Sequence, residues 1–216
     1  MPGTYLVVGG AGRTGRRAAD MLARDGHEVI VGSRRPYGPR TVTVDLARDL
    51  DPVLLDRVDG VLVSVEPPTN TPGAEAVLHH GVARLARLAV ARKTPVVLIS
   101  QIYVTRPAQY PDMSGIIQAR AAGEQALRDS GAPYTILRPS WLTEQPGAGV
   151  LLEQGDTGDG QVSRDTVASA AAAALLAPEA NGKTFELYDG NERPDWPTLF
   201  ARLRRDGNSS PSREPI

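Results

Sequence analysis

The chain of 216 residues has no cysteine, and only Lys93 and Lys183 among its 24 basic residues are lysines. The lack of cysteine excludes disulfides, zinc–thiolate sites and a thiol nucleophile. Residues 1–8 lack a basic start followed by an apolar core, so we expect no signal peptide, and no apolar run approaches the roughly 18–20 residues that span a bilayer. The net charge of -1 provides no field to attract nucleic acid or an acidic membrane. We therefore predict a cytoplasmic protein with neither of these partners and no metal site.

The length and the hydrophobic content of 41% are typical of one folded domain with a sizeable core. We assign residues 1–205 to that domain and expect the polar segment 206–216 to be a disordered tail. The excess of arginine over lysine and the many alanines are typical of a GC-rich coding sequence, which indicates a bacterial source.

Apolar, β-rich runs alternate along the chain with runs of helical periodicity. Several of the apolar runs are continuous, as in parallel strands that are covered on both faces. This alternation predicts an α/β fold with a doubly wound parallel sheet. The expected strands are 5–8, 28–31, 41–44, 61–65, 96–100, 134–137 and 184–188, and the expected helices are 13–25, 46–57, 74–92, 113–130, 164–177 and 196–205.

The glycine-rich segment 143–160 has no clear periodicity. It is expected to be either a mobile loop over a pocket or simply a long connection. The first alternative is favoured, because ligands of such sheets bind at the carboxyl edge.

The first strand runs into a glycine-spaced turn in the sequence YLVVGGAGRTG. Gly9, Gly12 and Gly15 fit GxxGxxG, and Gly10, Gly12 and Gly15 fit GxGxxG. Such glycines allow a tight turn and let a pyrophosphate approach the positive end of the next helix. The pattern alone is weak evidence, but its place between a strand and a helix favours a dinucleotide site over an ordinary strand–turn–helix connection.

The second strand ends in Ser33, Arg34 and Arg35, where a site that prefers NAD would carry a carboxylate for the ribose 2′-hydroxyl. A guanidinium presents donors in a geometry that suits a phosphate. Arg13 in the glycine turn is positioned to converge on the same place. The sequence therefore predicts NADP(H) as the cofactor, although an arginine pair can also be no more than solvated loop charge.

The pair Asp45 and Leu46 follows the third strand, where the adenine edge of a dinucleotide would lie. Asp45 is equally well explained as the N-cap of the helix expected after it.

Six stretches together resemble the atypical short-chain dehydrogenase/reductases with an NAD(P)H-binding, NmrA-like domain. They are GGAGRTG, GSRRP, VDGVLVSV, PVVLIS, GEQALRDSGAPYTILRPSWL and VSRDTVASAAAAALLAPEANGKTFELYDG. The resemblance covers roughly residues 3–190. It implies a Rossmann sheet of six or seven strands with a small C-terminal substrate portion. It also implies that Ser100 and the segment Arg138–Leu142 border the nicotinamide.

The chain departs from the catalytic pattern of that superfamily. Counting back from Glu124 places Arg120 where the superfamily has its lysine and Ile116 where it has its tyrosine acid. Isoleucine cannot donate a proton, and an arginine is not a proton carrier near neutral pH. The Tyr–Lys mechanism is therefore missing, and Arg120 is expected to hold the ribose or a phosphate unless it is a surface residue.

Substitute proton donors are Ser100, Tyr103 and Tyr110, which are expected near the nicotinamide. A tyrosine would need a nearby cation such as Arg106 or Arg120 to act as an acid at neutral pH. The alternative for each tyrosine is simple packing, and Trp141 is either a pocket wall or part of the core. The predicted cofactor-binding residues are Gly9, Gly12, Arg13, Thr14, Gly15, Ser33, Arg34, Arg35, Asp45, Leu46, Val65, Glu66, Ser100, Arg120, Pro139, Ser140 and Trp141.

These features lead to one preferred function and two alternatives. The preferred one is an NADPH-dependent oxidoreductase acting on a small apolar quinone, enone or carbonyl metabolite. The alternatives are a non-redox NADP(H)-binding regulator or sensor, and an isomerase or cyclase on the same fold. We expect the protein to be a monomer or a homodimer.

Overall fold

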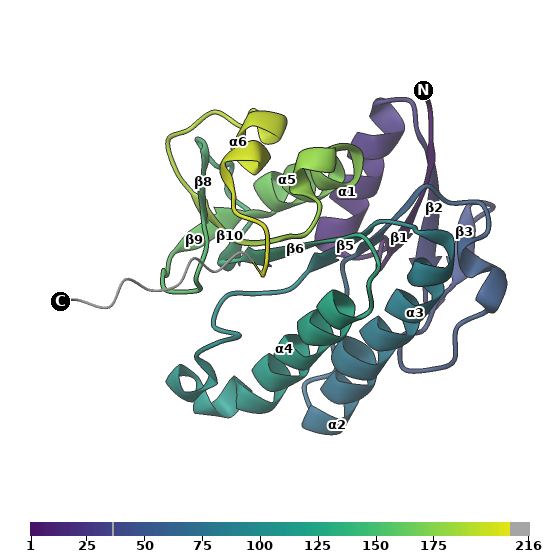
Figure 1. Cartoon of the computed structure of the whole chain (residues 1–216), viewed down its shortest axis with the longest axis horizontal. Helices are drawn as coiled ribbons and strands as arrows, with labels where there is room; N and C mark the ends of the chain where they lie inside the picture. The colour runs from purple at the N-terminus through teal and green to yellow at the C-terminus, as the bar shows by residue number, and fades with distance from the viewer. Residues whose placement is uncertain (36, 208–216) are drawn as a thin grey trace.

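The computed structural model describes residues 1–35 and 37–207, which form a doubly wound sheet with helices on both faces (Figure 1). The strand order is β3-β2-β1-β4-β5-β6-β10-β8, and the only antiparallel pairing in the described sheet is that of β8 with β10. The Rossmann-type fold predicted from the sequence is confirmed. The strands of this sheet are β1 Thr4–Val8, β2 Glu28–Ser33, β3 Thr41–Thr43, β4 Gly60–Val63, β5 Val96–Ile99, β6 Tyr134–Pro139, β8 Val150–Glu153 and β10 Lys183–Asp189.

The helices lie in two layers, one on each face of the sheet (Figure 1). One layer holds α1 Arg13–Arg24, α5 Arg164–Leu176 and α6 Trp196–Arg202. The other holds α2 Thr71–Ala74, the π-helical turns Glu75–Gly81, α3 Val82–Arg92 and α4 Ser114–Asp129. Short 3₁₀ turns are Pro52–Leu55, Pro107–Gln109, Pro111–Met113 and Pro178–Ala180.

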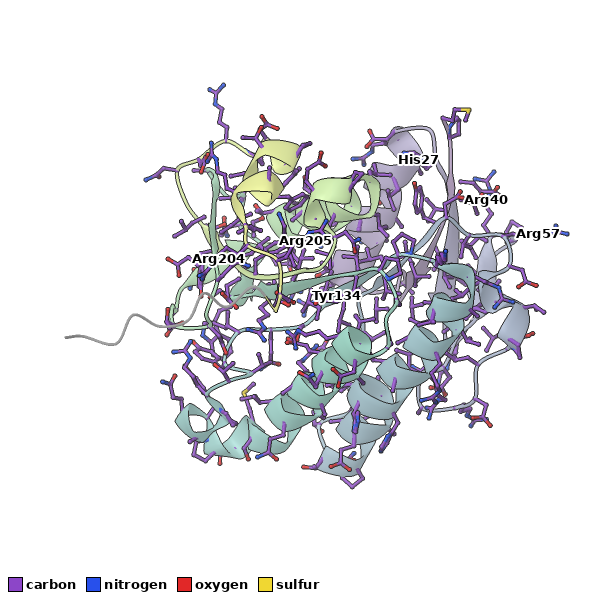
Figure 2. All side chains as sticks on the ribbon, in the orientation of Figure 1. His27, Arg40, Arg57, Tyr134, Arg204 and Arg205 are labelled. Atoms are coloured by element: carbon purple, nitrogen blue, oxygen red, sulfur yellow. The ribbon has the colours of Figure 1, made fainter. Side chains whose placement is uncertain are left out.

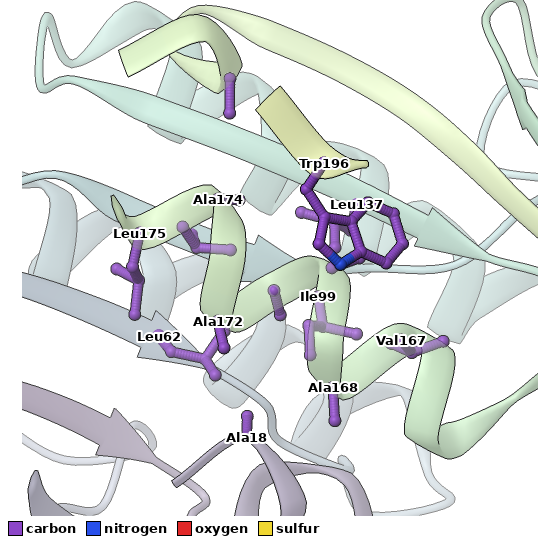
Figure 3. Close-up of a cluster of buried hydrophobic side chains, with 14 of the residues drawn as sticks. Ala18, Leu62, Ile99, Leu137, Val167, Ala168, Ala172, Ala174, Leu175 and Trp196 are labelled. Carbon is purple, nitrogen blue, oxygen red and sulfur yellow. The ribbon is translucent and has the colours of Figure 1, made fainter. Parts of the chain in front are cut away.

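Alanine-rich α5 packs directly on the middle of the sheet, against Leu62, Ile99 and Leu137 (Figure 3). Most of its residues are buried, because α1 and α6 cover its flanks. Small side chains let the helix lie close to the strands. Helices α1 and α5 lie side by side, and α1 begins just after the carboxyl end of β1.

The helix expected over 46–57 is wrong, because the described structure there contains only the 3₁₀ turn Pro52–Leu55. The Asp45 carboxylate accepts the N–H of Ala47, and the Asp51 carboxylate accepts that of Val53. Such short-range bonds stabilise turns in competition with a helix, and Pro52 lacks the N–H that a continuous helix would need. Asp45 is therefore a turn residue and not the cap of a long helix.

The segment 143–160 is more regular than the sequence indicated. It contains β8, and the flanking strands β7 Trp141–Thr143 and β9 Gln161–Ser163 pair with each other in parallel. The buried Asp156 accepts hydrogen bonds from the backbone N–H groups of Tyr103 (2.7 Å) and Thr105 (2.8 Å). The expectation of an irregular loop is corrected, because pairing with β10 and the Asp156 anchor fix much of this segment.

The chain beyond α6 is held at Asp206, whose carboxylate accepts hydrogen bonds from Thr184, Arg128 and Tyr134. Arg204, Arg205 and Tyr134 are labelled in this region in Figure 2. The rest of the expected tail, residues 208–216, lies outside the described residues. No described helix has both the length and the apolar character that a membrane span requires.

Candidate dinucleotide and substrate site

Three hollows follow one another along the carboxyl edge of the sheet. The first, of about 210 Å³, lies at the ends of β1, β2 and β4. The second, of about 160 Å³, shares Gly12, Val65 and Glu66 with the first. The third, of about 320 Å³, shares Ser100, Arg120 and Arg164 with the second. Together they form a trough, which we call the edge trough, and nearly all the predicted cofactor residues lie along it.

The glycine turn has the geometry that a dinucleotide site requires. Gly9 has a φ of 81°, and a Cβ there would lie 2.0 Å from the carbonyl oxygen of Ser64. A Cβ on Gly15 would lie 2.5 Å from the carbonyl oxygen of Gly9, so this glycine lets α1 pack closely on the turn. A Cβ on Gly12 would meet only the Gly9 carbonyl oxygen, at 3.2 Å. Apart from this one tight contact the Cβ position of Gly12 is open, and it lies at the start of α1, which has no side-chain cap and can receive a phosphate.

The first hollow contains one of the two arginines predicted to select the cofactor. Arg34 lines it together with Ser33, Asp45 and Leu46, whereas Arg35 does not line it. The side chain of Ser33 instead accepts the backbone N–H of Arg35 at 3.3 Å. Arg34 thus lies at the end of the trough that is formed by the carboxyl end of β2.

The second hollow brings Arg13 and Thr14 of α1 together with Ser100 and Arg120. The hydroxyl of Ser100 is buried and has no hydrogen-bond partner in the described structure. The guanidinium of Arg120 has a similarly unpartnered Nε, and its Nη1 lies 3.5 Å from the carbonyl oxygen of Ile99. Burial lowers the pKa of Arg120 to about 10, against the opposing charges of Glu124 and Glu66, so the group is still cationic at neutral pH.

Ile116, which the count from Glu124 assigns to the superfamily's tyrosine position, lies in α4. It is half-buried and packs against the cluster formed by Ala74, Leu78 and Ala119. Ile116 lines none of the three hollows, so its position supplies no proton donor to the trough.

Aromatic side chains build the outer wall of the third hollow. Trp141 and Tyr103 line it, and the ring of Tyr110 packs on that of Tyr103 with centroids 4.4 Å apart without lining the hollow itself. The indole Nε1 of Trp141 donates to the Tyr103 hydroxyl at 3.1 Å, and that hydroxyl donates to Asp159. Trp141 remains 45% exposed, so it is a pocket wall and not a core residue.

Tyr103 is a poor proton donor in this setting. Burial and the hydrogen bond to Asp159 raise the pKa of Tyr103 well above its ordinary value. The cation anticipated from the sequence is present, because the guanidinium of Arg106 lies 4.8 Å from the centroid of the Tyr103 ring. The charge of Arg106 does not offset the rise in the pKa of Tyr103 that burial and the Asp159 carboxylate cause. The catalytic roles suggested for Tyr103 and Tyr110 stay predictions that this geometry disfavours.

Arg138 points away from the edge trough, although its neighbour Pro139 lines it. Successive residues of a strand face opposite sides, and the guanidinium of Arg138 forms buried ion pairs with Glu124 (2.7 Å) and Glu186 (3.1 Å). The stretch GEQALRDSGAPYTILRPSWL, which contains both Glu124 and Arg138, thus includes a structural ion pair.

Two charged residues at the trough were not identified from the sequence. Arg164, the first residue of α5, lines the second and third hollows, and Glu144 after β7 forms an ion pair with it at 2.7 Å. The sequence feature that could have identified Arg164 is its position at the start of an expected helix, at the carboxyl edge of the sheet. No local pattern connects it with Glu144.

A family model described as NAD(P)H-binding matches residues 9–178. The chain belongs to this NAD(P)H-binding family. It is 29% identical to an uncharacterised chloroplastic protein of Arabidopsis thaliana, over 92% of this chain and 82% of that one. It is 32% identical to the (4-alkanoyl-5-oxo-2,5-dihydrofuran-3-yl)methyl phosphate reductase of Streptomyces griseus, over 83% of this chain and 66% of that one.

Solved structures show the same fold. A candidate NAD-dependent epimerase/dehydratase of Bacillus halodurans superposes with a TM-score of 0.83 and 24% identity, covering 93% of this chain and 100% of that one. A short-chain dehydrogenase/reductase of Veillonella parvula in complex with NADP superposes with a TM-score of 0.65 and 17% identity, covering 90% and 100%. These likenesses support the atypical short-chain dehydrogenase/reductase type of fold that the sequence motifs indicated.

Proposed function

We propose that this protein is an NADPH-dependent oxidoreductase that reduces a small, apolar, conjugated carbonyl compound or quinone. The observation that carries the proposal is the hydroxyl of Ser100, which is buried and unpartnered beside Arg120 where the second and third hollows meet. A buried polar group without a partner is costly, so its place at a hollow is evidence for a ligand that accepts its hydrogen bond.

The polarity of the third hollow changes along its length. At its outer end the polar atoms are used within the protein: Trp141 donates to Tyr103, Tyr103 donates to Asp159, and Ser140 donates to the carbonyl oxygen of Gly160. At its inner end Ser100 and Arg120 retain hydrogen-bonding capacity. This arrangement suits a ligand with a flat apolar body against Trp141 and a carbonyl oxygen toward Ser100.

The bound cofactor would supply a hydride, which needs an acceptor held beside the nicotinamide. Gly9, Gly12 and the start of α1 would hold its diphosphate, and Arg34 its 2′-phosphate, which favours NADP(H) over NAD(H). Arg120 adds positive potential where negative charge develops on a carbonyl oxygen. A quinone or an activated enone can then take its proton from water. Ile116, which cannot donate a proton, therefore argues against simple ketones as substrates more than it argues against reduction itself.

The Streptomyces griseus relative supports this class of substrate. Its name specifies a (4-alkanoyl-5-oxo-2,5-dihydrofuran-3-yl)methyl phosphate, so it supports the activated conjugated carbonyl group of the proposed substrate and not its apolar character, because that compound also carries a phosphate ester. A cytoplasmic location, a bacterial source and a monomeric or homodimeric state complete the proposal as the sequence predicted them, whereas two relatives are named as chloroplastic.

The competing function is a non-redox NADP(H)-binding regulator. The observation that favours it is the state of Tyr103, whose hydroxyl is held by Asp159, together with Ile116 in place of the family acid. Such a protein would bind NADPH and leave it unoxidised.

The deciding experiment is anaerobic NADPH oxidation with a panel of quinones, activated enones and simple ketones. We expect complete, catalytic oxidation with at least one quinone or enone. We also expect at least a tenfold loss of turnover in Ser100→Ala, with Ser114→Ala at the start of α4 as the control. Tight NADPH binding with only substoichiometric oxidation across the panel would contradict the reductase and support the regulator.

A further inference from the structure

Arg164 occupies an unusual place for an arginine of a helix N-terminus. Its side chain is only 13% exposed and lines both the second and the third hollow of the edge trough. Its Nη1 donates to the hydroxyl of Thr14 at 3.2 Å, which brings the guanidinium to the first turn of α1. That turn, after the glycines, is the place that a diphosphate requires.

The carboxylate of Glu144 gathers three arginines at the rim of the trough. It pairs with Arg164 at 2.7 Å, Arg17 at 2.9 Å and Arg13 at 3.2 Å. Glu144 lines none of the three hollows and its side chain is 50% exposed. The hydrogen bond from Arg164, with the charges of Arg164 and Arg17, lowers the pKa of Glu144, so it carries its negative charge at neutral pH.

We propose that Arg164 is a cofactor-binding residue for the dinucleotide's diphosphate, and that Glu144 is a counterion which the diphosphate displaces. This inference rests on NAD(P)H binding, which the family shows, and does not depend on the proposed reduction. Of the five N–H groups of the Arg164 guanidinium, those used within the described structure go to Glu144 and Thr14. The diphosphate replaces the Glu144 carboxylate as the acceptor.

The displacement follows from the charges and the exposure of the groups. A diphosphate carries more negative charge than a carboxylate and accepts from a guanidinium in the same forked geometry. Its arrival at the start of α1 also brings negative charge close to Glu144, whose exposed side chain can turn into water. Arg13 and Arg164, which line the trough, remain there and contact the diphosphate.

The test is titration of NADPH and of shorter fragments into Arg164→Met and Glu144→Gln. Methionine retains an unbranched apolar stem and removes the charge. We expect Arg164→Met to raise the Kd for NADPH by about 10- to 100-fold, the range of a lost charged hydrogen bond. Adenosine 2′-monophosphate, which has no diphosphate, should bind equally to this variant and the wild type. Glu144→Gln should lower the Kd for NADPH, because the competing charge is gone.

The matched control is Arg17→Met. Arg17 pairs with Glu144 and with Asp165 but lines none of the three hollows, so its loss removes the same charge without removing a diphosphate donor. Two results would overturn the inference: NADPH affinity of Arg164→Met within twofold of wild type, or a Glu144→Gln variant that binds NADPH more weakly, which would make Glu144 a structural support of Arg164. A wild type that binds no NADPH would refute the cofactor proposal itself. Melting temperatures of the variants identify any general loss of structure.

Discussion

The guanidinium of Arg138 and the carboxylate of Glu124 form a buried two-pronged ion pair that joins β6 to α4. Nη2 of Arg138 lies 2.7 Å from Oε2 of Glu124, and its Nε lies 3.1 Å from Oε1. Glu124 is fully buried and Arg138 is 8% exposed. Arg128 also donates to Glu124, so two arginines neutralise one buried carboxylate.

Replacement of Glu124 by glutamine should destabilise the protein strongly. The substitution removes the Glu124 charge and leaves Arg138 with the carboxylate of Glu186 as its remaining ion-pair partner in the described structure. Removal of one member of a buried ion pair costs about 3–5 kcal/mol of the free energy of unfolding. We expect a loss near the lower end of this range in urea unfolding. The exposed Asp112 provides the control, because Asp112→Asn should change the free energy of unfolding by less than about 0.5 kcal/mol. A loss under 1 kcal/mol for Glu124→Gln would show that the pair is dispensable.

Glycines 9 and 12 should respond to substitution in opposite ways. Gly9→Ala places a Cβ 2.0 Å from a backbone oxygen at a φ of 81°, so we expect little folded protein. At Gly12 the added Cβ meets only the Gly9 carbonyl oxygen, at 3.2 Å, so Gly12→Val should largely keep the fold and abolish dinucleotide binding by filling the place of the diphosphate. Circular dichroism and NADPH titration test both expectations. A folded Gly12→Val that binds NADPH normally would place the phosphate site elsewhere.

Arg34 should determine the preference for NADP(H) over NAD(H). Arg34→Ala is expected to weaken NADPH binding by about 1–3 kcal/mol and to leave NADH binding unchanged. Arg35→Ala should have the smaller effect, because only Arg34 lines the first hollow. Arg40→Ala, in the loop before β3, is an exposed control (Figure 2). Equal NADPH and NADH affinities in the wild type would refute the preference.

Arg120 should anchor the cofactor and not transfer a proton. Arg120→Ala is expected to raise the Kd for NADPH and to lower turnover with no new pH dependence, because the guanidinium stays charged below its pKa of about 10. Calorimetry measures the affinity, and Arg87→Ala on exposed helix surface is the control. Unchanged affinity together with unchanged turnover would contradict the anchoring role.

The ionisation of Tyr134 at alkaline pH should make the folded protein less stable. Burial and the hydrogen bond to Asp206 raise its pKa to about 12 from an ordinary value near 10. A raised pKa contributes stability below pH 10 that is lost as the pH rises through 12. The lowered pKa of Arg120 acts in the opposite direction, so the informative quantity is the difference between wild type and Tyr134→Phe. Between pH 9 and 11.5 the melting temperature should fall more in the wild type than in Tyr134→Phe; equal falls would contradict the prediction.

Much of the fold could be predicted from the sequence because its signals are local. The apolar run before Gly9, the glycine spacing up to Gly15 and the alternation of strands with helices each depend on neighbouring residues. The helix expected after Asp45 failed because short-range carboxylate bonds and Pro52 outweighed the periodicity. The strand β8 was missed because its register depends on β10, more than thirty residues further along the chain.

By itself the sequence determined the α/β class, the dinucleotide turn and the arginine at the end of β2, and it predicted that Ile116 replaces the tyrosine acid. Only the tertiary structure decided which of these side chains share a space. It placed Arg34 in the trough and Arg35 outside it, turned Arg138 away into an ion pair, held the Tyr103 hydroxyl on Asp159 and joined Arg164 to Glu144. The reason is physical: turns and periodicities arise from local backbone preferences, whereas burial, hydrogen-bond partners and charge arise from contacts between residues far apart in the chain.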